Sequence, residues 1–145
     1  MNFEIMLLVG LYLFIMMLLD IKNKKIPSII PTTIILFLIV TIGLRSYPSF
    51  QPDLYFGIMG FVLAWLLYEF DYFRGIADIK AIVIISLTLA SLNQFYTFVT
   101  LLIFIGLMYQ VVLIQVFKYK QGKEIPFMPV FFIVYVCLQL LIYVF

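Results

Sequence analysis

Residues 79–92 read IKAIVIISLTLASL, and the residue directly before them is Asp78. A second apolar run, residues 7–19 with the sequence LLVGLYLFIMMLL, ends directly against Asp20. A carboxylate at a membrane face is costly to desolvate, so each of these aspartates is a candidate for function. The two stretches decide the fold, because apolar runs of the same kind fill most of the chain.

The composition is that of an integral membrane protein. Of the 145 residues, 66% are apolar and 11% are charged, whereas a typical soluble domain has about 25% charged residues. The apolar runs recur up to the last residue, so a signal peptide does not explain them. The chain has no histidine and a single cysteine, Cys137. This excludes histidine-activated nucleophiles, His-rich zinc sites and multi-cysteine metal sites, and we expect neither a metal nor a cofactor.

Six apolar segments predict an all-α, polytopic membrane protein with six transmembrane helices in a single domain, residues 1–145. The segments are Phe3–Leu19, Ser28–Leu44, Leu54–Phe70, Ile79–Leu92, Phe95–Phe117 and Ile125–Phe145. Helices are favoured because exposed backbone is not tolerated in lipid. Most segments approach the ~20 residues that cross a bilayer, although the fourth would rise only about 21 Å. Small residues predict close helix packing on the third and fourth segments: Gly57, Gly60, Ala64, Ser86 and Ala90.

The basic residues predict the orientation of the helices. Eight of the nine Lys and Arg residues lie in or beside the connections that follow the first, third and fifth segments. Positively charged connections stay in the cytoplasm, so both termini are expected outside, with Asp20 and Asp78 together on the cytoplasmic side. The net charge of +2 reflects this topology, and we expect no nucleic-acid partner. The eight residues are Lys22, Lys24, Lys25, Arg74, Lys80, Lys118, Lys120 and Lys123.

Each aspartate also has a structural interpretation. Asp78 can cap the N-terminus of the fourth helix and interact favourably with its dipole. Asp20 can pair with Lys24 if the first helix continues to Lys25, an interaction that contributes about 0.2–0.5 kcal/mol. These interpretations stand beside that of a functional carboxylate pair.

Three short motifs occur in order along the chain. Residues 20–27 read DIKNKKIP, residues 75–80 read GIADIK, and residues 124–129 read EIPFMP. Together they resemble the motifs of the type IV prepilin peptidases and archaeal preflagellin peptidases, the GxGD-type membrane aspartyl proteases, over nearly the whole chain. The resemblance implies that Asp20 and Asp78 are catalytic. It also implies a set of residues that support the motifs: Pro27, Gly75, Ala77, Lys80, Pro126 and Pro129.

Some features depart from the family pattern or have a simpler explanation. Ala77 stands where the family has the second glycine of GxGD, which adds a methyl group where backbones approach closely. Pro126 fits the first position of the sixth helix as an ordinary start signal. The zinc-binding cytoplasmic domain of the larger bacterial enzymes is missing, so we expect a short form without N-methylase activity.

The resemblance implies a leader peptidase in a prokaryotic cytoplasmic membrane. Repulsion between two close carboxylates leaves one protonated and one ionised, so that one activates water while the other donates a proton to the scissile carbonyl. The expected partners are the lipid bilayer and prepilin-like precursors, pilins or archaellins, with a short basic leader before an apolar helix. We hypothesise that Glu69, Asp71 or Glu124 attracts the positive charge of the leader.

Two other functional classes remain open. A small transporter or channel could use Asp20 and Asp78 as proton or cation sites, although such sites usually lie near the membrane midplane in broken helices. A membrane assembly protein without enzymatic activity is the second alternative.

Overall fold

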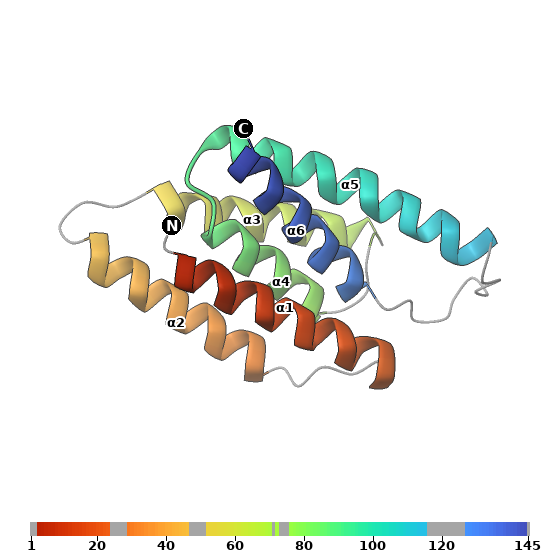
Figure 1. Cartoon of the computed structure of the whole chain (residues 1–145), viewed down its shortest axis with the longest axis horizontal. Coiled ribbons are helices and arrows are strands. Elements are labelled where there is room, and N and C mark those ends of the chain that lie inside the picture. The colour runs from red at the N-terminus through yellow and green to blue at the C-terminus, as the bar shows by residue number, and fades with distance from the viewer. Residues whose placement is uncertain are drawn as a thin grey trace.

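The computed structural model of the chain describes residues 3–23, 29–46, 52–70, 72, 76–115 and 127–144, which form six helices and no strand (Figure 1). This confirms the predicted all-α class, with one helix for each predicted apolar segment. The helices are α1 (Phe3–Asn23), α2 (Ile29–Ser46), α3 (Pro52–Glu69), α4 (Ile76–Leu87), α5 (Leu92–Gln115) and α6 (Met128–Val144).

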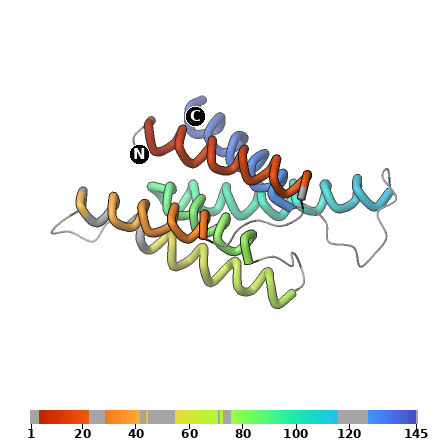
Figure 2. Tube along the Cα trace, turned by 90° about the horizontal axis from the view of Figure 1, so that it is seen from below, coloured from red at the N-terminus to blue at the C-terminus, as the bar shows by residue number. Residues whose placement is uncertain are grey.

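Successive helices run in opposite directions. The ends of α1, α3 and α5 and the starts of α2, α4 and α6 lie at one end of the bundle, and the chain termini lie at the other (Figure 1). Figure 2 shows α1 and α6 together on one side and α2 and α3 on the other. Helix α4 lies between them and contacts α3, α2, α6 and α1. This arrangement brings Asp20, near the end of α1, and Asp78, near the start of α4, to the same end of the molecule.

The central position of α4 depends on close contact with α3. Eight of the twelve residues of α4 are buried, as expected for a helix that is apolar on all sides. A side chain at Gly57 would collide with Leu87, and one at Gly60 would collide with Ser86. Small residues on one face of α3 therefore let the two backbones approach. The predicted packing is confirmed for this face, but Ala90 is exposed and lies beyond the end of α4.

The structure corrects the predicted boundaries of the first and fourth helices. Helix α1 continues to Asn23, so Asp20 lies inside its last turns rather than after its end at Leu19. Helix α4 covers Ile76–Leu87 instead of Ile79–Leu92. It ends before Leu92 because a capping interaction starts α5 there. The amide of Gln94 donates to Ser91 Oγ at 3.3 Å, and Gln94 Oε1 accepts from the amide of Ala90 at 2.9 Å. This exchange is close to a capping box, whose Ser-x-x-Gln signal is present in the sequence.

Helix length separates the six helices into groups. Among the described residues, the stretches Glu4–Lys22 and Leu92–Gln115 are long and apolar enough to cross a membrane by length and composition. Shorter apolar stretches cover Ile29–Thr41, Tyr55–Glu69 and Met128–Val144, and α4 has only 12 residues. The structure therefore shows six helices, of which two reach spanning length by this measure.

Substituting Gly60 with alanine should destabilise the bundle, because the added methyl group would collide with Ser86. Overpacking of this kind typically costs about 1–3 kcal/mol. Thermal unfolding of the purified protein should show a lower midpoint. The same substitution should cost less in a Ser86→Gly background, because the two residues share one contact.

The matched control is Gly10→Ala on α1. An added Cβ at Gly10 would lie 3.6 Å from Tyr135 Cε1, which is an ordinary contact. If Gly10→Ala lowers the stability as much as Gly60→Ala does, the α3–α4 contact contributes no more to stability than an ordinary helix contact.

Candidate active site

Asp20 extends the buried face of α1 at the end of the bundle. Val9, Tyr12 and Met16 are buried and recur at helical spacing, and half-buried Asp20 follows Met16 by one turn on the same face. Its Oδ2 accepts a hydrogen bond of 3.0 Å from the backbone amide of Met128, the first residue of α6. The side chain therefore points toward the interior and joins two helices that are far apart in the sequence.

This contact makes the Asp20 carboxylate a cap of α6. The first amides of a helix have no partner within the helix and carry partial positive charge, so the contact favours the ionised form of Asp20. The predicted alternative partner, Lys24, lies outside the described residues. The structure thus adds a capping role that no local pattern in the sequence indicates, because donor and acceptor are 108 residues apart.

Asp78 is the most enclosed charged residue in the described part of the chain. It is 9% exposed and lies in the first turn of α4, two residues after the helix begins at Ile76. The helix dipole favours a negative charge there, although burying an ionised carboxylate remains costly.

The two aspartates lie on helices that contact each other and that both contact α6. We call this region the α1–α4–α6 junction. Asp20 contacts the start of α6, and Asp78 lies in the first turn of α4. Both predicted catalytic residues therefore lie on helices of this junction, at the same end of the molecule.

Tyr72 attaches the connection between α3 and α4 to α5. Its hydroxyl donates to the carbonyl of Leu102 at 2.9 Å, and the carbonyl of Ile103 lies 3.2 Å away. The side chain of Gln110 donates to the Tyr72 carbonyl at 3.1 Å. Gly106 leaves room for the phenol, because a side chain there would collide with it. Burial raises the pKa of Tyr72 to about 12, so the phenol remains a donor at neutral pH.

An aromatic cluster continues this attachment to the start of α6. Phe127 packs edge-on against Tyr72, with ring centroids 5.4 Å apart, and its ring also contacts Tyr109 at 6.4 Å and Phe131 at 5.3 Å. Phe127 directly precedes Met128, whose amide binds Asp20. The residues that lead into α4 and those that start α6 are thus held by one cluster.

Tyr72 and Phe127 were not predicted as parts of the site. Phe127 lies inside the EIPFMP motif, so its position was already marked. No local pattern identifies Tyr72, because its partners are about 30 residues further along the chain.

Lys80 and Ala77, two of the residues predicted to support the motifs, flank Asp78 on α4. Lys80 Nζ donates to Thr32 Oγ1 of α2 at 2.7 Å. Because Lys80 follows Asp78 by two residues, its side chain points about 200° away from that of Asp78 around the helix. Lys80 therefore connects α4 to α2. Ala77 is partly buried against the core, so its methyl group is accommodated in the packed bundle.

The start of α6 requires a correction. The helix begins at Met128 and not at Ile125, so the proline that the structure places in its first turn is Pro129. Pro129 is buried, and the amide that it lacks would have no partner within the first turn. The role predicted for Pro126 as the first helical residue is therefore wrong.

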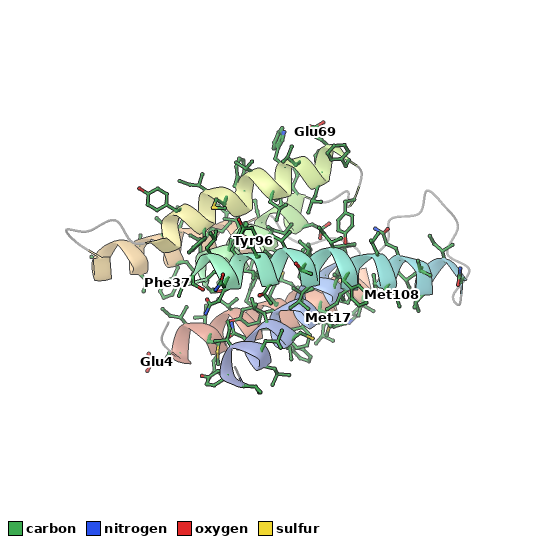
Figure 3. The ribbon with its side chains drawn as sticks, turned by 90° about the horizontal axis from the view of Figure 1, so that it is seen from above. Glu4, Met17, Phe37, Glu69, Tyr96 and Met108 are labelled. Carbon is green, nitrogen blue, oxygen red and sulfur yellow. The ribbon has the colours of Figure 1, made fainter. Side chains whose placement is uncertain are left out.

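The residues predicted to attract a basic leader are described only in part. Glu69 is exposed at the end of α3 (Figure 3), at the same end of the bundle as the junction. Pro27, Asp71, Gly75, Glu124 and Pro126 lie outside the described residues. Within the described part, no three Asp, Glu or Cys side chains gather in a way that could hold a metal ion.

Comparisons of the chain with protein-family models, with curated proteins and with solved structures find no match.

Replacing Asp20 by alanine should lower the stability by about 1 kcal/mol, because α6 loses the acceptor for its first amide. Asp20→Asn keeps an acceptor oxygen and should recover most of this loss. Thermal unfolding measures both. Lys22→Ala, an exposed position in the same last turn, serves as the control and should change the stability by less than about 0.5 kcal/mol. Equal losses for the alanine and asparagine variants of Asp20 would contradict the capping role.

Proposed function

We propose that this chain is a membrane aspartyl endopeptidase that removes the short basic leader from prepilin-like precursors, with Asp20 and Asp78 as its catalytic pair. The observation that carries the proposal is the placement of both carboxylates at the α1–α4–α6 junction, one half-buried and one 9% exposed. Enclosed ionisable groups in an apolar bundle mark functional sites more often than structural ones. The structure describes part of each of the three sequence motifs, at the end of α1 and at the starts of α4 and α6. These helix ends lie at the same end of the bundle (Figure 1).

The outer surface of the bundle supports insertion into a membrane. Only 22% of the residues in each of the two spanning-length windows are buried, and large apolar side chains are exposed on α1, α2, α3, α5 and α6. Soluble proteins rarely expose apolar surface on this scale. Lipid would cover these side chains, and the shorter helices α2, α3 and α6 would fit a locally thinner bilayer. Helix α4 rises only about 18 Å, but the other helices enclose it, so its length need not match the lipid.

In this proposal the two carboxylates have different roles. The contact with the start of α6 favours a charged Asp20, whereas burial disfavours a charged Asp78. Asp20 then takes a proton from the attacking water, and Asp78 donates its proton to the oxygen of the scissile carbonyl as the tetrahedral intermediate forms. No metal or cofactor is needed for this step, because water supplies the nucleophile and the two carboxyls supply and receive the protons.

The orientation predicted from the basic residues places this junction at the cytoplasmic face. A precursor that presents a basic leader on that face and an apolar helix in the bilayer would bring its cleavage point to the junction. Exposed Glu69 at the same end would attract the positive charge of the leader, as would Asp71 and Glu124 under the same hypothesis.

Either Asp20→Asn or Asp78→Asn should abolish processing of a co-expressed prepilin-like precursor. Loss of one member of an acid–base pair reduces the rate by about 100-fold or more. Asparagine preserves the shape of each side chain, so the amount of protein in the membrane should stay unchanged, as immunoblots of the membrane fraction would show. Glu4→Gln, an exposed carboxylate at the opposite end of α1, should retain processing. Normal processing by either asparagine variant would exclude a required carboxylate pair.

Cysteine labelling tests the proposed orientation. In a Cys137→Ala background, single cysteines at Glu4 and Lys22 mark the two exposed ends of α1. A membrane-impermeant maleimide applied to intact cells should label Glu4→Cys directly and Lys22→Cys only after the cells are permeabilised. Labelling with the opposite preference would invert the topology and remove the junction from the cytoplasmic face.

A further inference from the structure

We infer that Tyr72 is a positioning residue of this site, which fixes the carboxylate of Asp20 through Phe127 and the start of α6. The inference rests on the proposed peptidase function. It concerns a residue that lies in the connection between α3 and α4, outside the three sequence motifs.

Hydrogen bonds hold Tyr72 at three points. Its amide donates to the carbonyl of Leu67 on α3 at 2.9 Å, and its carbonyl accepts from the side chain of Gln110 on α5 at 3.1 Å. Its hydroxyl donates to the carbonyl of Leu102, also on α5, at 2.9 Å. Backbone and ring of Tyr72 are therefore both anchored, so the ring cannot shift without breaking one of these bonds.

Gly106 provides the space in which the phenol lies on α5. A side chain at this position would collide with the Tyr72 hydroxyl, and its Cβ would lie 3.2 Å from Cζ of Phe127. Glycine inside a helix costs about 1 kcal/mol relative to alanine, and the close approach of these two rings to the α5 backbone explains why it is present. Tyr72 and Phe127 thus share one place on α5.

Phe127 transmits the position of Tyr72 to the start of α6. It is 4% exposed, and its ring packs edge-on against that of Tyr72, with centroids 5.4 Å apart. The peptide group that joins Phe127 to Met128 is planar. Its carbonyl accepts from the amide of Val130 at 3.0 Å, and its N–H donates to Asp20 Oδ2 at 3.0 Å. A shift of Phe127 therefore turns the donor that holds Asp20.

The chemistry of the proposed reaction gives this chain of contacts a purpose. Asp20 takes the proton of the attacking water, so its carboxylate must keep one orientation relative to that water. The amide of Met128 limits rotation of the carboxylate by holding Oδ2. A misplacement of about 1 Å at a reacting group lowers the rate by about 100-fold. Tyr72 itself acts only through the residues between it and Asp20.

Tyr135 provides an internal comparison. Its hydroxyl also donates to a backbone carbonyl of another helix, that of Met6 on α1, at 3.0 Å. This bond joins α6 to α1 near the opposite end of the bundle (Figure 1). Removing the hydroxyl of Tyr135 or of Tyr72 thus takes away the same kind of bond, and the two losses differ in their distance from the junction.

Substitution of Tyr72 with phenylalanine tests the inference, because it removes the hydroxyl and keeps the ring. Tyr72→Phe should reduce kcat for leader removal by about fivefold, the size of one neutral hydrogen bond, and leave KM unchanged. Tyr135→Phe should leave kcat within about twofold of wild type, because distant contacts do not couple. A rise in KM at constant kcat would assign Tyr72 to substrate binding and overturn the inference.

Gly106→Ala reaches the same contact from the other side. The added methyl group should displace the phenol from α5 and reduce kcat at least as much as Tyr72→Phe does. The double variant should lose less than the product of the two separate effects, because both substitutions disturb one contact. Independent, multiplicative effects would overturn the inference.

Hydrogen exchange provides a readout that does not depend on peptidase activity. Residues 128–130 carry only the amides of Met128 and Val130, because Pro129 has none. Asp20→Ala gives the exchange expected when the bond to Met128 is lost. Tyr72→Phe should speed exchange in this segment by about fivefold, and Tyr135→Phe by less than about twofold.

Unchanged exchange in Tyr72→Phe, or equal values of kcat for Tyr72→Phe and Tyr135→Phe, overturns the inference. If the wild-type protein cleaves no precursor, the peptidase function fails instead. Exchange at Met128 then decides by itself whether Tyr72 fixes the contact with Asp20.

Discussion

Close contact between α3 and α4 is the constraint on which the rest of the structure depends. Gly57 and Gly60 remove the side chains that would hold the two backbones apart. Helix α4 can then occupy the centre of the bundle, where it contacts α2, α3, α6 and α1. Its first turn carries Asp78 into an environment that is almost closed to solvent. A carboxyl group in such a position follows from the packing of the whole helix and not from the local sequence around the aspartate.

The junction is built by contacts between parts of the chain that are distant in sequence. Asp20 ties the end of α1 to the start of α6, and Tyr72 ties the connection before α4 to α5 and to Phe127. These contacts hold the two aspartates on rigid elements, which is what acid–base chemistry requires of its groups. The two aspartates also differ in their surroundings, because Asp20 is half-buried and caps the start of α6, whereas Asp78 lies in the first turn of α4 and is almost closed to solvent. This difference underlies the separate roles that we propose.

Local signals explain where the prediction of the helices succeeded and where it failed. Long apolar runs predicted one helix for each of the six segments, because backbone in an apolar environment must satisfy its own hydrogen bonds. The boundary between α4 and α5 was missed although Ser91 and Gln94 form a recognisable capping pair. Helix α1 continues through Asp20 to Asn23, because a charged side chain does not by itself end a helix. The Asp20 carboxylate has its partner outside α1, at the amide of Met128. The residues next to Tyr72 in the sequence carry no local signal that predicts its contacts with α5.

The sequence by itself determined the helical class, the number of helices and the placement of Asp20 and Asp78 at one end of an alternating bundle. These properties depend only on the order of apolar runs and polar connections. Only the tertiary structure decided that α4 is central, that Asp20 caps α6 and that Tyr72 is bound to α5. The physical reason is that apolar residues surround most helices on all sides, so no periodic pattern distinguishes the side that faces the other helices from the side that faces outward. That choice is made by glycine contacts and buried hydrogen bonds between distant segments.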